Sequence, residues 1–383
     1  MISSYQNILN SKFYFQEDLL NRNESSFNYF INNLESFPFD EIQEIDVFQD
    51  GILSYGQKKN WGFYEILICK TIFKKDTISK IALIGEKNSN QNNLALYVTN
   101  YDNLLKLSGN SEVFGQLKVP NGHTEQAYIN GQVGNSIKII GVQSRSDDKL
   151  PKIDKNISIT TSNYSPILLN HTKNESIINN GFDKETKIID LTGITRLRDV
   201  ALRGNIIITS NSTLEIDSSA KLNDILILAP KVIVTSGFKG NIQIVAKELV
   251  DIEQDVSLLY PSSIYIKNDI DSVHVAIKNN SKIIGGIVID GDTYKGSLKR
   301  ELVIDEKATV IGNVYCYGKT QLLGKIIGNI YTDRFFLKTE SLDYENVILN
   351  GSINKDSLPK NFIGLPLFKH NLGTKKYAII KKY

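Results

Sequence analysis

The chain contains little cysteine, tryptophan, methionine and proline. Its 383 residues include two Cys, one Trp, one Met and eight Pro. The two cysteines, Cys69 and Cys316, are too few for a disulfide framework or for a metal site built from several cysteines. A single disulfide between them stays open.

An excess of charge of one sign and long apolar runs are also missing. Lys plus Arg number 44 and Asp plus Glu 42, and a net charge of +2 does not suggest a nucleic-acid partner. The sequence has no apolar run long enough for a transmembrane helix, and its first residues lack the basic and apolar regions of a signal peptide. We expect either a cytoplasmic protein or one whose targeting segment was removed before Ser3, with membrane contact only through that missing segment.

Motifs for cofactors and metals are absent as well. The sequence has no GxGxxG, no GxxxxGK[ST] and no GxSxG. The four histidines, His123, His171, His274 and His370, are scattered, and no pair has the spacing of metal ligands. We therefore predict no cofactor and no metal, and we expect His274 to lie on the face of a strand.

A short repeat is the clearest positive signal. Residues 311–315 read IGNVY, and residues 327–331, sixteen positions later, read IGNIY. Apolar residues alternate with polar or small ones, which is typical of a half-buried strand. A return after sixteen residues is too short for a βαβ unit, and it fits one coil of a parallel β-helix.

The same pattern extends over much of the chain. β-branched residues follow a glycine or a polar residue at intervals of 16 to 27, at Ile206, Ile225, Ile242, Ile264, Ile287, Val314, Ile330 and Ile353. We expect these side chains to stack inward, one per coil, with Gly or Asn at corners that need positive φ. Asn side chains at successive corners are expected to bond to each other. A β-sandwich with many glycine turns is the alternative.

The first hundred residues predict a different architecture. Residues 5–36 indicate a helix with an apolar stripe at Phe13, Leu20, Phe27, Ile31 and Leu34. Residues 42–99 predict an antiparallel meander with strands at 44–48, 62–73, 78–84 and 94–98 and a polar turn at 57–60. The helix is expected to pack on this sheet; alternatively it is the soluble half of a longer membrane helix.

Together these patterns predict a mainly β protein, a parallel β-helix preceded by a small α+β domain. The expected domains are residues 1–100, the β-helix at 101–365 with an irregular excursion at about 142–185, and a tail at 366–383. The basic tail is expected to be a solvated end, with an added edge strand as the alternative.

Two charged clusters are candidates for chemistry. Asp290, Asp292 and Asp305, with Lys299 and Arg300 nearby, offer carboxylates for acid–base catalysis on a polysaccharide. A solvated loop is the simpler interpretation, so we predict no catalytic residue and keep Asp290, Asp292, Asp305 and Lys299 as the alternative. Arg196, Arg198, Asp199 and Arg203 favour salt bridges at the start of the coils over an anion site.

Residues 107–131 resemble a pattern found in uncharacterised envelope proteins of the Bacteroidota. The matching positions are Leu107, Ser108, Gly109, Val113, Gly115, Val119, Pro120, Gly122, Tyr128, Ile129 and Gly131. This resemblance implies a pilin-like N-terminal segment, an α+β region and a β-helix. The coils at 309–331 are also similar to those of bactofilins, which are cytoskeletal β-helix polymers.

The function predicted first is a non-enzymatic structural or assembly protein of the bacterial cell envelope. Its expected location is the periplasm or the outer surface, with a membrane anchor in the native form, and the cytoplasm is the alternative. It would present a rigid β-helix to other envelope proteins or to copies of itself, as part of a secretion system or a pilus-like machine. A β-helix protein that binds or degrades polysaccharide and a bactofilin-like scaffold are the alternatives.

Overall fold

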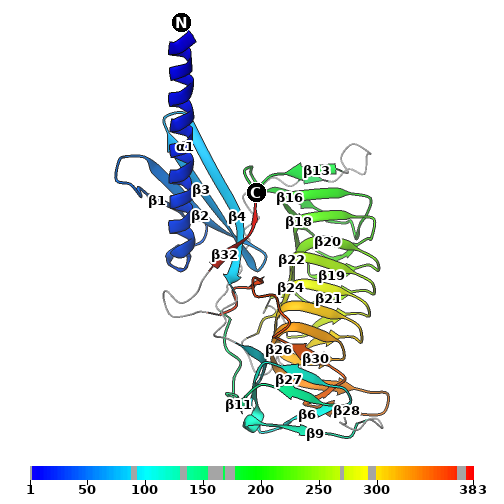
Figure 1. Ribbon diagram of the computed structural model, residues 1–383. Helices are drawn as coiled ribbons and strands as arrows, with labels where there is room; N and C mark the ends of the chain where they lie inside the picture. Colours follow the sequence, from blue (N-terminus) through cyan, green and yellow to red (C-terminus); the bar gives the residue numbers. More distant parts are fainter. Residues whose placement is uncertain are drawn as a thin grey trace. The chain divides into compact units, whose positions relative to one another are not determined.

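The computed structural model describes residues 2–87, 93–129, 136–153, 167–168, 177–267, 271–291, 299–368 and 377–383. Within these ranges the protein is mainly β, with one α-helix (Figure 1). It divides into two compact units. Unit 1 contains the residues up to Lys87 and the C-terminal strand, and unit 2 contains the described residues from 93 to 368. The predicted fold class, a parallel β-helix preceded in the chain by a helix and an antiparallel sheet, is confirmed.

Unit 1 is a helix on an antiparallel sheet. Helix α1 (Ile2–Asn32) is followed by a short 3-10 turn, η1 (Leu34–Ser36). The sheet contains β1 (Ile42–Ile45), β2 (Leu53–Trp61), β3 (Tyr64–Phe73) and β4 (Asp76–Lys87) in chain order, and β32 (Tyr377–Lys382) lies antiparallel on β4. The expected solvated tail is therefore wrong for residues 377–382, because they complete this sheet.

Strand β2 was missed because its inward side is small and polar. Residues 57–60, predicted as a turn, lie inside β2, and the turn falls at Gly62 and Phe63 instead. Gly56 leaves space for the ring of Phe30, which lies 2.6 Å from where a Cβ would stand. Lys58 is buried and donates from Nζ to the carbonyl of Leu34 at 2.9 Å. An inward row of this kind gives no apolar alternation for a sequence pattern to detect.

Unit 2 is a stack of coils with three faces. Face 1 contains β10 (Lys138–Ile140), β7 (Glu112–Phe114), β30 (Ser352–Asn354), β13 (Ile177–Asn180) and the first parts of the long strands β16 (Ala201–Thr209), β18 (Lys221–Leu228), β20 (Lys239–Ala246), β22 (Ser257–Ile266), β24 (Lys282–Ile289), β26 (Thr309–Leu322) and β27 (Lys325–Lys338). Face 2 contains the following parts of those long strands with β5 (Leu94–Val98), β8 (Gln116–Val119), β11 (Gln143–Arg145), β12 (Ile167–Leu168) and β14 (Lys187–Asp190).

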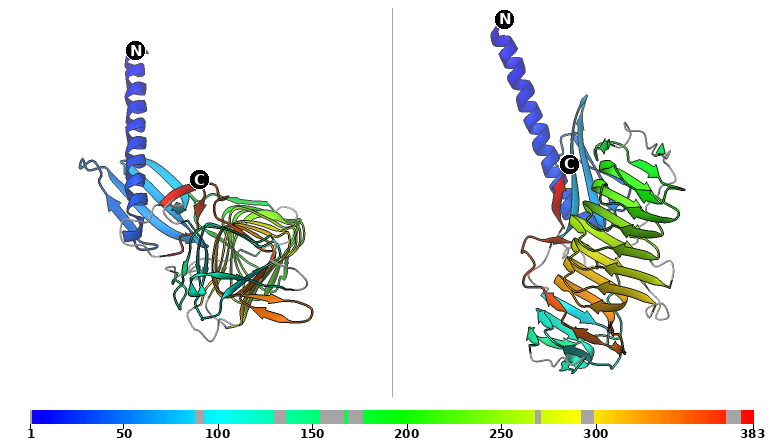
Figure 2. Two further views of the ribbon diagram at one scale, coloured as in Figure 1. Left: turned by 60° about the horizontal axis from the view of Figure 1, so that its bottom comes forward. Right: turned by 90° about the vertical axis from the view of Figure 1, so that its right-hand side faces the viewer.

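Face 3 is built from shorter strands. They are β15 (Arg196–Leu197), β17 (Thr213–Ile216), β19 (Lys231–Val234), β21 (Leu249–Ile252), β23 (Val273–Ile277), β25 (Arg300–Ile304) and the last parts of β26 and β27. A small sheet of β29 (Val347–Leu349), β6 (Leu105–Ser108) and β9 (Thr124–Gln126) follows, and β28 (Asp343–Glu345) pairs back on β27. The remaining elements are η2 (Pro120–Gly122) and β31 (Ile363–Gly364). Figure 2 shows the coils stacked with strands of neighbouring coils side by side.

The predicted inward column is correct in most places. Ile206 pairs with Ile225 and Ile225 with Ile242, and a second run pairs Ile264, Ile287, Val314 and Ile330. Two steps differ. Ile264 lies on Ile244 because the register shifts after Gly240, and Ile353 lies on Ile326.

The order of the coils in space differs from their order in the chain. Strand β5, predicted as the last strand of the meander, pairs in parallel with β27 and β8, so Leu96 covers Ile330. The β-helix thus includes residues 94–98, before the predicted boundary at residue 100. Within the predicted excursion, β11 and β13 are strands at opposite ends of the stack, while residues 154–166 and 169–176 lie outside the described residues.

The corners follow the predicted chemistry. Gly312 and Gly328 have φ of 130° and 145°. A Cβ on Gly328 would lie 1.9 Å from the carbonyl oxygen of Gly312, so stacked corners leave no space for a side chain. Beside them, Asn313 donates from Nδ2 to Oδ1 of Asn329 at 2.9 Å, which is the predicted bond between successive corners.

Candidate interaction site

The C-terminal half of α1 holds the helix on its sheet. Phe27 and Leu34 of the predicted stripe are buried, and Ile31 packs against the same core. Phe13 and Leu20 are 66% and 54% exposed, so the stripe was wrong at these two positions. The buried side instead passes through Leu19, Asn23, Ser26, Phe27 and Phe30.

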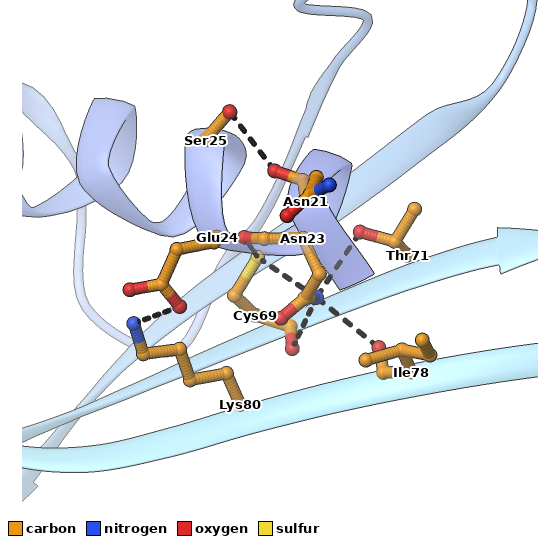
Figure 3. Close-up of polar contacts among 8 residues, drawn as sticks. All are labelled: Asn21, Asn23, Glu24, Ser25, Cys69, Thr71, Ile78 and Lys80. Atoms are coloured by element: carbon orange, nitrogen blue, oxygen red, sulfur yellow. Dashed lines mark hydrogen bonds and ion pairs between the residues drawn. The ribbon is translucent and has the colours of Figure 1, made fainter. Parts of the chain in front are cut away.

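Polar groups fix the helix at the centre of this contact (Figure 3). Asn23 is 1% exposed, and its Nδ2 donates to the carbonyl of Ile78 at 3.1 Å, to Oγ1 of Thr71 at 3.1 Å and to the carbonyl of Cys69 at 3.3 Å. Ser26 donates to Oγ of Ser54 at 2.8 Å. Each such bond contributes about 1 kcal/mol, and together they fix the position of the helix along its axis.

An ion pair and a buried thiol border this network. Lys80 pairs with Glu24 and lies 4.3 Å from the ring centroid of Phe27. Burial raises the pKa of the Cys69 thiol to about 12, so it stays protonated. Cys316 is also free and buried, and its pKa is likewise raised to about 12 by burial. The two cysteines form no disulfide with each other.

The N-terminal half of α1 extends beyond the sheet. Phe15 packs against Phe73, with ring centroids 5.1 Å apart. Before it, residues 9–14, which we call the projecting segment, are all exposed. Leu9, Phe13 and Tyr14 are 48%, 66% and 68% exposed. Figures 1 and 2 show α1 continuing past the strands of its own unit. Among the described residues, no helix combines the length and the apolar character needed to cross a bilayer.

Exposed aromatic and aliphatic side chains on one stretch of helix are costly in water. Burying each large apolar side chain is worth roughly 1.5–3 kcal/mol. Leu9 and Phe13, four residues apart, lie on the same side of the helix, and exposed apolar side chains that gather on one side mark surfaces that bind a partner. The projecting segment is therefore the candidate interaction site of unit 1.

Of the carboxylates predicted as alternative catalytic groups, the structure describes Asp290 and Asp305. Asp290 follows β24, accepts a hydrogen bond from the hydroxyl of Tyr265 at 3.0 Å, and lies beside Arg300, whose guanidinium donates to its carbonyl. Arg300 is the first residue of β25, and Asp305 directly follows the last residue of that strand, next to Lys278 and Asp251. Burial raises the pKa of Asp305. The backbone of β25 from Arg300, which bonds to the carbonyl of Asp290, to Asp305 spans about 16 Å, whereas the two carboxylates of a glycosidase lie roughly 5–10 Å apart.

Of the other members of that cluster, the structure describes Lys299 and Arg300. Lys299 is exposed, and Asp292 lies outside the described residues. Arg300 is 1% exposed and donates to the carbonyls of Lys267 and Asp290, and burial lowers the pKa of its guanidinium. Its contacts join two coils.

One arginine of the predicted cluster, Arg196, forms salt bridges between coils. Arg196 on β15 pairs with Asp217 and approaches Glu215, at 3.9 Å, on β17. Asp199 has φ of 54° and its N–H donates to Oγ of Ser219 at 2.9 Å. Arg198 and Arg203 are exposed.

The structure describes two of the four histidines, His123 and His274. His274 points outward from β23, as predicted, and lies 3.5 Å from Glu301. His123 follows η2 and is exposed, and His171 and His370 lie outside the described residues. In the described part of the chain, no three His, Cys, Asp or Glu residues come close enough to hold a metal ion.

Comparisons with known proteins give little more. No protein-family model matches the chain, and no curated protein matches it. Among solved structures, the competence-associated pilin ComZ from Thermus thermophilus aligns over 98% of this chain and 95% of its own, with 10% identity and a TM-score of 0.22. A TM-score of this size carries no argument about fold or function, so function has to be argued from the geometry of this chain.

Proposed function

We propose that this protein is a non-enzymatic assembly protein of the bacterial cell envelope, part of a secretion or pilus-like machine. It would attach to that machine through the projecting segment of α1 and display the β-helix to other proteins. The exposed apolar side chains Leu9, Phe13 and Tyr14, on a helix whose other half is fixed to a sheet, support this proposal.

The two halves of α1 are suited to these different tasks. The buried Asn23 and Ser26 bonds hold the C-terminal half in one position, so the projecting segment is presented in a defined direction from its sheet. The β-helix adds stiffness because every coil is bonded to its neighbours. The resemblance of residues 107–131 to envelope proteins with a pilin-like N-terminal segment agrees with this role.

Site-specific photo-cross-linking in the source bacterium tests the proposal. A cross-linking amino acid at Phe13 should trap the same envelope protein reproducibly, whereas one at exposed Asn28, on the part of α1 that packs on the sheet, should not. Phe13→Gln with Leu9→Gln should remove the protein from the envelope fraction, and Lys12→Gln should leave it there. Recovery of the unaltered protein in the cytosolic fraction, without a cross-link at Phe13, would overturn the proposal.

A further inference from the structure

The three faces of the β-helix differ in their outer surfaces. On the middle coils of face 2 many outward residues are themselves buried, among them Tyr315, Tyr331 and Tyr97. Phe368 packs on Tyr331 with ring centroids 4.8 Å apart. On face 3 the cations are paired with acids of neighbouring coils, as in Lys231–Glu248 at 2.9 Å, Lys278–Asp251 at 2.8 Å and Lys319–Glu301 at 2.6 Å.

Face 1 carries a row of lysines that lack such acids. Strands β18, β20, β24 and β27 each begin with a lysine, and the four side chains, which we call the lysine row, are Lys221, Lys239, Lys282 and Lys325. All four are exposed, and none makes an ion pair with a residue that the structure describes.

The register places these lysines in one line. Lys239 pairs with Ser257, Ser257 with Lys282, Lys282 with Thr309, and Thr309 with Lys325. Lys221 lies one coil before Lys239, since Asn223 pairs with Asn241. At about 4.8 Å per coil, the five steps from Lys221 to Lys325 span about 24 Å.

The surroundings leave the row positive. The corners that lead into face 1, with the neighbouring outward position, add four cations and six acids. They are Arg198, Arg203, Lys278 and Lys307 against Asp199, Asp217, Glu253, Asp255, Asp305 and Glu306. With the four lysines of the row, the net charge is +2. Beyond Ser352 the line ends where Glu112 pairs with Lys138 at 3.1 Å.

A straight row of unpaired ammonium groups fits a linear polyanion. We infer that face 1 binds an anionic polysaccharide, a chain whose carboxylate groups recur along its length. Ser257 and Thr309, between the lysines, supply hydroxyls that can bond to sugar hydroxyls. The inference is independent of the proposed function, because it does not involve α1.

Nucleic acid is the competing polyanion, and the described residues favour it less. Binding of single strands relies on aromatic side chains on which bases stack. The row from Lys221 to Lys325 contains no aromatic residue, and the neighbouring Tyr260 packs on Phe362, with ring centroids 5.4 Å apart. A row that has positive charge but no aromatic side chains for bases to stack on fits a carboxylated glycan better than a nucleic acid.

Two triple variants with the same net charge test the inference. In the full chain, K239Q/K282Q/K325Q removes cations from face 1, and K231Q/K278Q/K319Q removes paired cations from face 3. Binding of polygalacturonate, a linear polyuronate, is measured by calorimetry at low and at physiological salt. We expect the face 1 variant to bind about tenfold more weakly with a smaller salt dependence, and the face 3 variant to change by less than about twofold.

Three results would overturn the inference. Equal losses in both variants would mean that only net charge matters, and no binding by the unaltered protein would mean that the row has no such ligand. Tighter binding of single-stranded or duplex DNA of equal charge would assign the row to nucleic acid. Circular dichroism of both variants confirms that they are folded, and a neutral glucan should not compete.

Discussion

At single residues, the corners of the coils leave the least freedom. Gly312 has φ of 130°, and a Cβ there would lie 2.0 Å from the carbonyl oxygen of Gly285. Gly193 also has positive φ, 83°, but nothing lies within 4 Å of its Cβ position. A side chain at Gly193 would therefore cause backbone strain alone, whereas a side chain at Gly312 would cause strain and a clash with the neighbouring coil.

Gly312→Ala should lower the free energy of unfolding of unit 2 by more than the about 1–3 kcal/mol expected from strain alone. Gly193→Ala should stay within that range, because it adds no clash. Urea unfolding followed by circular dichroism measures both. Equal effects of the two substitutions would show that contact between corners contributes nothing.

Asp217 links stability to pH. The N–H of Ser219 donates to its Oδ1 at 2.9 Å and Arg196 pairs with Oδ2, and together these bonds lower its pKa from 3.8 to about 2. Because the folded pKa is the lower one, this stabilisation is fully present above about pH 4 and is lost as the pH falls toward 2.

Asp217→Asn should therefore cost about 1 kcal/mol at pH 7, a value reduced for the half-exposed Arg196. The difference from the unaltered protein should shrink between pH 4 and pH 2. Urea titrations at a series of pH values measure it. Asp148→Asn, at an exposed site, serves as the control, and a loss that does not vary with pH would contradict the assignment.

At the scale of elements, α1 combines a fixed half with a projecting half. The buried amide of Asn23 bonds to β3 and β4, so it ties the helix to two strands at once. Removing it leaves the carbonyls of Cys69 and Ile78 without that donor.

Asn23→Ala should destabilise unit 1 by about 1–3 kcal/mol. Asn21→Ala, two residues earlier and exposed, should change the stability by less than about 0.5 kcal/mol. Trp61, the only tryptophan, is buried in unit 1, so its fluorescence during urea unfolding reports on this unit. Similar effects of both substitutions would mean that the Asn23 bonds are not needed.

At the scale of the whole molecule, the β-helix is inserted in the chain between two neighbouring strands of one sheet. Strands β4 and β32 pair antiparallel, with Ala82 opposite Lys382, and unit 2 lies between them in sequence. Tyr377 and Ile379 of β32 also pack on the core beneath α1.

Removing residues 377–383 should therefore lower the melting temperature of unit 1 by at least about 5 °C and leave that of unit 2 unchanged. Trp61 fluorescence and circular dichroism follow the two units in one melt. Leu342→Ala, an exposed residue of unit 2, should shift neither transition. A truncation that shifts both transitions equally would mean that the units unfold together.

The sequence alone determined the β-helix, most of its inward column and the bonded corners, because all of these repeat within one coil of about sixteen to twenty-seven residues. It also indicated the helix and strands β3 and β4. The lysine row was not predicted, although a lysine begins the repeats at 221, 239, 282 and 325. Whether these lysines are paired depends on which acids lie in the neighbouring coils, and the sequence does not show that.

Only the tertiary structure decided which distant segments meet. Leu96 covers Ile330, and β32 completes the sheet of β4, across more than two hundred residues of chain. The sequence of a strand that is buried on both faces does not depend on which strand it pairs with. A local sequence pattern therefore cannot predict these pairings. Likewise, the sequence alone favours an exposed position for Asn23 and Ser26. They are buried because they bond to small, polar side chains of β3 and β2, Thr71 and Ser54.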